Sequence, residues 1–156
     1  MIELTPKKFR ISSGYGISKY GLLSFDYALA NAGISDYNIV KVSSILPPCC
    51  LESPILDLKK GSILLTAYGT ITSENQGNVI SSAVCVAIPQ SSDDIGVIME
   101  TAGLWSADNS KRIVKEMAEL AMQSRNIPIK NIFCSSIDYV VHANECATVI
   151  SAVSMW

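Results

Sequence analysis

The order of apolar and polar residues predicts two helices separated by a long run of strands. One helix is predicted over residues 22–34 and the other over 106–126, because apolar residues recur in both at helical spacing. They are Leu22, Leu23, Phe25, Leu29 and Ala32 in the first, and Ile113, Val114, Met117, Leu120 and Ala121 in the second. Gly33 is typical of a helix C-terminus, and Pro128 ends the second helical region.

β-Branched and alternating segments predict strands elsewhere. These segments are 38–44, 62–74, 78–89, 93–103, 131–143 and 146–156. Residues 1–20 are more polar and contain Gly14 and Gly16, which indicates an arm or an edge strand. Strands and helices do not alternate regularly, so a doubly wound parallel sheet is disfavoured. The pattern favours an α+β sandwich in which helices cover mostly antiparallel sheets.

Composition limits the class of protein. A chain of 156 residues predicts one domain, 1–156, with a single core. Hydrophobic residues make up 49% and charged residues 17% of the chain, which excludes disorder. A net charge of −2 predicts neither nucleic-acid nor membrane binding, and no apolar run reaches the ~18 residues of a membrane helix. The charged N-terminus is unlike a signal peptide, so a cytoplasmic location is expected.

The cysteines and the single histidine predict no metal site. Five cysteines lack CxxC spacing, and His142 has no histidine neighbour with which to bind zinc. Free thiols in a reducing compartment are therefore expected. Cys49 and Cys50 form an adjacent pair to which the sequence assigns no role.

The doublet Ser43-Ser44 has two interpretations from its residues alone. Most serine pairs are solvated or capping residues. Alternatively, the Ser44 hydroxyl attacks the preceding carbonyl, which needs a strained, polarised bond shielded from water. A strand that must end before Pro47 would be a place for such strain.

Several segments resemble one family in the same order and at compatible spacing. They are "FDYALANAGISDYNIV", "VSSILPP", "GSILLTAYGTITS", "AVCVAIPQ" and "GVIMETAG". From Leu22 to the C-terminus the chain resembles the pyruvoyl-dependent arginine decarboxylases. The resemblance implies a four-layer αββα sandwich and a homotrimer with each active site at a subunit interface.

The resemblance also implies that the chain cuts itself between Ser43 and Ser44. The products would be a β chain of residues 1–43 and an α chain of residues 44–156. Ser44 would become dehydroalanine and then a covalent pyruvoyl group, so no external cofactor and no metal are expected. The implied reaction converts L-arginine to agmatine and carbon dioxide through a Schiff base, with the pyruvoyl ketone as electron sink.

The resemblance assigns roles to individual residues. Glu100 would protonate Cα, and the apolar run before it predicts a raised pKa. Asp26 would pair with the substrate guanidinium, and Asn38 would donate a hydrogen bond to the Ser43 carbonyl. Three residues would form apolar walls for the substrate stem: Leu22, Leu29 and Ile45. Without the resemblance, Asp26 is an ordinary helix-surface residue, Glu100 a solvent-facing strand end and Asn38 a turn residue.

Two other functions remain open on this sequence. One is a pyruvoyl decarboxylase of another amino acid, which the guanidinium partner Asp26 disfavours. The other is an unprocessed homologue that serves as a binding or structural subunit, which the intact Ser43-Ser44 pair disfavours. The sequence also leaves open whether agmatine would serve polyamine synthesis or acid resistance.

Overall fold

The structure is a computed structural model that describes residues 4–156, so the first three residues of the predicted N-terminal segment lie outside it. Within this range the helices are α1 (Gly21–Asn31) and α2 (Ala107–Ser124). The strands in the same range are β1 (Lys8–Ser18), β2 (Asn38–Lys41), β3 (Ile45–Leu46), β4 (Leu51–Glu52), β5 (Ile63–Ser73), β6 (Val79–Pro89), β7 (Gly96–Gly103), β8 (Ile129–Val140) and β9 (Cys146–Met155).

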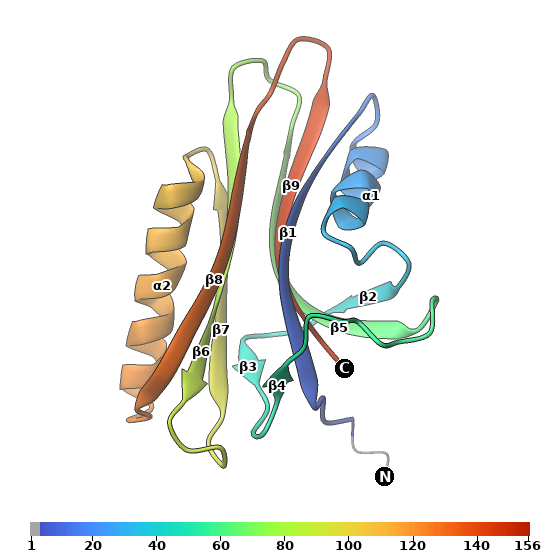
Figure 1. The fold of residues 1–156 in the computed structure, drawn as a ribbon. Helices are drawn as coiled ribbons and strands as arrows, with labels where there is room; N and C mark the ends of the chain where they lie inside the picture. The colour runs from blue at the N-terminus through green and yellow to red at the C-terminus, as the bar shows by residue number, and fades with distance from the viewer. Residues whose placement is uncertain (1–3) are drawn as a thin grey trace.

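The strands form two sheets that pack face to face. One sheet has the order β2-β5-β9-β1-β4 and the other β3-β7-β6-β8. Helix α1 covers the outer face of the first sheet and α2 the outer face of the second, so the layers run α, β, β, α (Figure 1). All described strand pairs are antiparallel except β1 with β4 and β2 with β5. The predicted α+β sandwich is confirmed.

Helix α2 follows directly from its sequence pattern. Its N-cap residue is Ser106, whose side-chain oxygen accepts a hydrogen bond from the Asn109 backbone amide at 3.3 Å. One face of the helix is buried against the second sheet, while the charged residues lie on the other side. The buried residues in this contact are Val114, Ala118 and Met122 from α2, with Ala83, Ala87 and Val97 from the sheet.

Helix α1 packs unusually close to β1. A Cβ on Gly16 would collide with the Ser24 carbonyl oxygen and the Ala28 amide nitrogen, and Gly14 meets α1 in the same way. These two glycines therefore let the helix backbone approach the strand. The helix ends at Asn31, earlier than the predicted range, and the predicted role of Gly33 at its C-terminus is confirmed, because Gly33 adopts a left-handed φ of +76° just beyond it.

The predicted arm or edge strand at the N-terminus is strand β1. It pairs with β9 from Phe9 to Ser18, and with β4 only at Lys8 and Phe9. Beyond Phe9 the strand has a neighbour on one side only, so the edge-strand alternative holds for most of its length. In residues 4–156, no helix combines the length and the apolar character that crossing a membrane requires.

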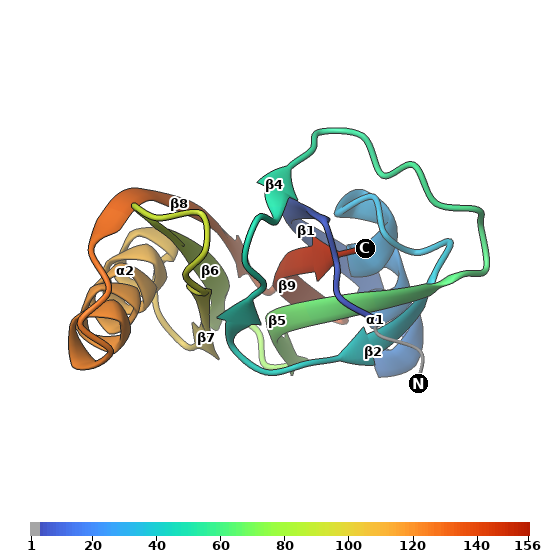
Figure 2. The same ribbon diagram turned by 90° about the horizontal axis from the view of Figure 1, so that it is seen from below.

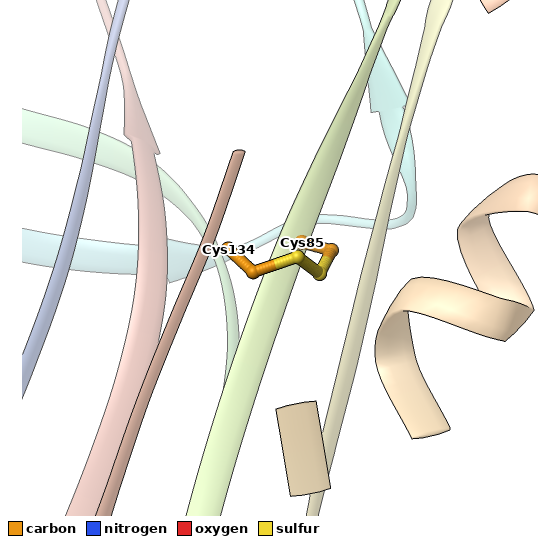
Figure 3. The surroundings of a disulfide bond; sticks show 2 residues. All are labelled: Cys85 and Cys134. Carbon is orange, nitrogen blue, oxygen red and sulfur yellow. A yellow bond between two sulfur atoms is a disulfide. The ribbon is translucent and has the colours of Figure 1, made fainter. Parts of the chain in front are cut away.

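The expectation of free thiols is wrong for two of the five cysteines. Cys85 on β6 and Cys134 on β8 stand opposite each other in the sheet and form a disulfide (Figure 3). They are 49 positions apart in the sequence, which gave no spacing signal, because strand register alone brings them together. Cys49 is exposed and free, and Cys50 and Cys146 are buried and free. Burial raises the pKa of the Cys50 thiol to about 11, so it carries little thiolate near neutral pH.

Candidate active site

The bond between Ser43 and Ser44 lies where the chain crosses from one sheet to the other. Before it, the Val42 amide donates to the Thr66 carbonyl on β5 at 3.1 Å. After it, the Ser44 carbonyl accepts from the Ile98 amide on β7 at 2.7 Å. The view in Figure 2 follows this crossing from β2 to β3. Each side of the bond is therefore held by a different sheet, and a break in it would leave both new ends anchored.

The crossing is partly exposed to solvent. Ser43 is exposed and Ser44 is partly buried. Among residues 4–156 the non-glycine residues with positive φ are Cys49, Asn126 and Asn144, so neither serine has left-handed backbone strain.

Glu100 lies on β7, the strand that pairs with β3. Ile98 on the same face packs between the two sheets, whereas the neighbours Val97 and Met99 face α2. Glu100 is partly buried, and this desolvation raises the pKa of its carboxyl, while the positive charge of Lys41 acts in the opposite direction. The raised pKa predicted for Glu100 is confirmed.

Lys41 on β2 and Tyr68 on β5 lie next to each other in the first sheet. Lys41 is the last residue of β2 and lies opposite Thr66 of β5. Its Nζ sits 4.7 Å from the centre of the Tyr68 ring, close enough for a cation–π interaction. Sequence reasoning missed both residues, because a lysine near a strand end and a tyrosine within a strand are ordinary features on their own.

Asp26 lies in a separate, largely apolar hollow on α1. The hollow has a volume of about 590 Å³. Its lining residues are Tyr20, Leu22, Leu23, Phe25, Asp26 and Leu29. Three of the four predicted substrate-binding residues thus share one hollow: Asp26, Leu22 and Leu29. Leu22 is 83% exposed, so a large apolar side chain at the rim of the hollow faces solvent in this chain.

One chain does not assemble all predicted site residues. Ile45, the fourth predicted substrate-binding residue, pairs with Val97 on the second sheet and does not line the hollow. Asn38 is the first residue of β2. Its side-chain amide donates to the Gly61 carbonyl at 2.7 Å and makes no hydrogen bond to Ser43 in this chain. Asn38 and Ser43 are five positions apart, which is roughly 16 Å along an extended chain.

The predicted residues therefore form two groups. The first contains Ser43, Ser44, Ile45 and Glu100, where β3 meets β7. The second lies on α1 around Asp26, in the outer layer of the other sheet (Figure 1). Across residues 4–156, no group of three or more His, Cys, Asp or Glu side chains is arranged to hold a metal ion.

Comparisons with known proteins agree on one family. The family model described as pyruvoyl-dependent arginine decarboxylase matches residues 8–156. The chain is 35% identical to the protein of that name from Methanococcus aeolicus, over 97% of this chain and 90% of the relative. It is 34% identical to the one from Methanocaldococcus jannaschii, with the same coverage.

A solved structure shares the fold. It is a pyruvoyl-dependent histidine decarboxylase at pH 8, with a TM-score of 0.50 and 17% sequence identity. The similarity covers 64% of this chain and 52% of the other, so the chain spans about half the length of that protein.

Proposed function

Because the chain belongs to the pyruvoyl-dependent arginine decarboxylase family, we propose that it cleaves itself between Ser43 and Ser44 and then converts L-arginine to agmatine and carbon dioxide. One observation carries this proposal. Ser44 leads into the edge strand β3, and the strand paired with β3 bears Glu100, a partly buried carboxyl whose pKa is raised. The nucleophile for processing thus directly precedes β3, and an acid for turnover lies on the strand paired with β3.

The processing step follows from the position of the Ser44 hydroxyl. Its oxygen attacks the Ser43 carbonyl carbon, the peptide C–N bond breaks, and an ester and a free amine result. Elimination then releases Ser43 as a new carboxylate terminus, and hydrolysis of the remaining enamine releases ammonia and leaves the pyruvoyl group. The Ile98 amide, which donates to the Ser44 carbonyl, would hold the new terminus against β7 throughout.

The residues around Ser44 fit such a group. When present, the pyruvoyl group supplies a ketone that condenses with the substrate amine and withdraws electrons from Cα. Glu100 holds the proton that Cα needs after carbon dioxide has left. A carboxyl in a partly desolvated position keeps that proton to higher pH than an exposed glutamate does, which suits a general acid.

Asp26 supplies the charge that selects arginine. The guanidinium is always protonated and offers a planar pair of donors that matches a carboxylate. The apolar side chains around Asp26 would contact the methylene stem and partly exclude water from the ion pair. Lysine and ornithine lack the planar fork, so they would bind this hollow less well.

We further propose a homotrimer in which each complete site combines residues of two chains. Support comes from the separation of Asp26 from the group at Ser44, and from the exposed apolar side chains on α1 and beside it. These include Tyr20, Leu22, Leu23 and Tyr27. Asn38 could then meet Ser43 of another copy. A cytoplasmic location, where free arginine is available, completes the proposal and can be checked by cell fractionation.

Mass spectrometry under denaturing conditions tests self-cleavage. The two fragments should together weigh the intact chain plus one water minus one ammonia, and Ser44→Ala should stay a single chain. Fragments whose masses sum to the intact chain plus water alone would show hydrolysis without pyruvoyl formation. An intact wild-type chain after prolonged incubation would refute the proposed function.

Labelled substrates test the choice of arginine. Carbon dioxide release should be fastest from arginine in a set that also contains lysine, ornithine and histidine. Release from lysine but not from arginine would overturn the role of Asp26.

Mixing two inactive variants tests the shared site. Asp26→Ala and Glu100→Gln chains, unfolded and refolded together, should regain part of the activity, because some interfaces then contain neither substitution. No recovery in mixed trimers would place both residues in a site within one chain.

A further inference from the structure

We propose that Gly69 is a positioning residue for the decarboxylation: because it has no side chain, β5 contacts the backbone of β7 beside Glu100 and fixes where that carboxyl lies. The inference rests on the proposed function and adds a residue to it. Neither the sequence pattern nor the resemblance assigned Gly69 a role.

The two sheets come into backbone contact at Gly69. A Cβ on this residue would lie 2.7 Å from the Thr101 carbonyl oxygen, 3.0 Å from its carbonyl carbon and 3.2 Å from its amide nitrogen. The amide nitrogen belongs to the peptide that joins Thr101 to Glu100. Facing sheets usually lie about 10 Å apart, with side chains filling the space between them. The closer approach here therefore requires glycine at position 69.

A buried hydroxyl from the second sheet is bonded to the same glycine. The side chain of Ser82 on β6 is fully buried and donates to the Gly69 carbonyl at 2.7 Å. Ser82 pairs with Ala102, so it lies beside the strand that carries Glu100. A buried hydroxyl without a partner is costly, so this hydrogen bond favours the close approach of β5 to the second sheet.

The segment of β7 around Glu100 is held on both sides of that residue. Before it, the Ile98 amide donates to the Ser44 carbonyl at 2.7 Å. After it, Thr101 lies against Gly69. Glu100 is on the same face of β7 as Ile98, which packs between the two sheets. One hydrogen bond and one backbone contact thus set the position of the carboxyl along β7 relative to Ser44.

The contact lies where both strands are edges of their sheets. Strand β2 pairs with β5 only as far as Thr66, and β3 pairs with β7 only at Gly96 and Val97. Farther along, β5 and β7 lie beside each other (Figure 2), and no other strand of residues 4–156 pairs with these edges. Because no ladder hydrogen bonds hold this side of β7, the contact with Gly69 decides how close Glu100 lies to the first sheet.

The chemical role of this contact is geometric. Glu100 has to reach the substrate carbon that it protonates, and a misplacement of about 1 Å can slow such a step by about a hundredfold. Alanine at position 69 would need about 0.7 Å more space to restore the ordinary contact distance of 3.4 Å. The atoms that it meets are backbone atoms, so β7 itself has to move, and Glu100 moves with it.

Steady-state kinetics of Gly69→Ala tests the inference. In processed enzyme, kcat for arginine should fall by about ten- to a hundredfold, while KM stays within about twofold of wild type. The KM is spared because Asp26 is on α1, which packs on the opposite face of β5. A kcat within twofold of wild type would overturn the inference.

Gly14→Ala is the control for lost stability. Its Cβ would overlap the Ala28 carbonyl oxygen of α1, so it disturbs packing without touching β7. It should change KM rather than kcat, because Asp26 moves with α1. An equal loss of kcat in Gly14→Ala and Gly69→Ala would show that lost stability alone lowers turnover and would overturn the inference.

The Glu100 carboxyl provides a readout that does not depend on activity. Carbon-13 NMR of glutamate-labelled Ser44→Ala precursor follows its titration, with the resonance assigned by its absence after Glu100→Gln. In this precursor, Gly69→Ala should lower the titration midpoint toward that of an exposed glutamate, because outward movement of β7 admits water. Gly14→Ala should leave the midpoint unchanged. A loss of kcat with an unchanged midpoint in Gly69→Ala would place the effect away from Glu100 and overturn the inference.

The other titratable groups around β7 are not moved toward Glu100 by these substitutions. Strand β7 packs against β3, β5, β6, β9 and α2. Among the described residues β3 has no titratable side chain, Tyr68 on β5 and Cys146 on β9 face α1, and Cys85 on β6 is in the disulfide. The Lys41 charge, which lowers the Glu100 pKa, comes from β2. The charged α2 residues lie across the sheet: Asp108, Lys111, Arg112, Lys115, Glu116 and Glu119.

Ser82→Ala tests the same contact if Gly69→Ala does not fold. It removes the donor to the Gly69 carbonyl and adds no atom near β7. The kcat should fall by about two- to tenfold at unchanged KM, and the Glu100 midpoint should again move down. Wild-type values of both in Ser82→Ala would then overturn the inference. Failure of the wild-type chain to decarboxylate arginine would refute the proposed function instead, and the precursor titrations would still test the positioning of Glu100.

Discussion

Replacing Gly16 with alanine should push helix α1 away from the sheet and weaken arginine binding. The new Cβ would overlap the Ser24 carbonyl oxygen and the Ala28 amide nitrogen and would lie 2.7 Å from the Cβ of Tyr27. Two of these atoms belong to the helix backbone, so no side-chain rotation relieves the overlap. Ordinary contact begins near 3.4 Å, so α1 must move outward by about 1 Å.

The expected loss of stability follows from this displacement. Inserting a methyl group into a packed contact costs about 1–3 kcal/mol, and a gap approaching 1 Å also weakens the dispersion contacts of the buried α1 residues. These contacts join Ala28, Leu29 and Ala32 to Leu64, Ile150 and Ala152. We expect the free energy of unfolding to fall by about 2 kcal/mol, which a domain with a stability of about 5–15 kcal/mol survives.

Denaturant unfolding and steady-state kinetics check the two consequences separately. The KM for arginine should rise by roughly tenfold or more, because Asp26 moves with the helix, while cleavage between Ser43 and Ser44 should proceed as in wild type. Gly21→Ala is the matched control. Its Cβ would meet only the Cys146 sulfur at 3.8 Å and a Thr72 methyl at 4.0 Å, so stability should stay level or rise slightly. Equal unfolding free energies for the two variants would refute the reasoning from close packing.

Three further predictions concern the proposed site and the disulfide. Asp26→Asn should raise the KM for arginine by about ten- to a hundredfold, since a charged hydrogen bond is lost; a KM within twofold of wild type would exclude the ion pair. Turnover should fall as pH rises through the raised pKa of Glu100, because only the protonated carboxyl can donate, and Glu100→Gln should slow turnover at every pH and remove this limb. Cys85→Ser should lower the unfolding free energy by about 2–4 kcal/mol in non-reducing buffer. A reductant should produce the same loss in wild type and none in the variant; a reductant effect in both would place the cause elsewhere.

Local sequence determined much of the fold. Both helices and the long strands follow from the spacing of apolar residues, because that spacing records which side of an element is buried. The pair Pro47-Pro48 correctly marks a break in strand structure, since proline cannot donate to a ladder. The short strands β3 and β4 were not separable from loop, because two residues carry no periodicity.

Part of the candidate site could also be predicted from local sequence, and part could not. Asp26, Ser43, Ser44 and Glu100 could be singled out because each lies in a segment that resembles the family, and the apolar run before Glu100 correctly predicted its raised pKa. No local pattern indicated that the charge of Lys41 would act on the pKa of Glu100. That effect depends on β2 joining β5 and on β3 joining β7, two pairings between segments distant in sequence.

The sequence by itself thus determined both helices, the long strands, the α+β class and the doublet Ser43-Ser44. The tertiary structure alone decided that this doublet spans the two sheets, that Cys85 meets Cys134, and that α1 carries Asp26 away from Ser44. The physical reason is the range of the forces involved. Periodicity and proline or glycine backbone limits act within a few residues, whereas strand pairing and helix packing join residues far apart and are selected by the energy of the whole chain.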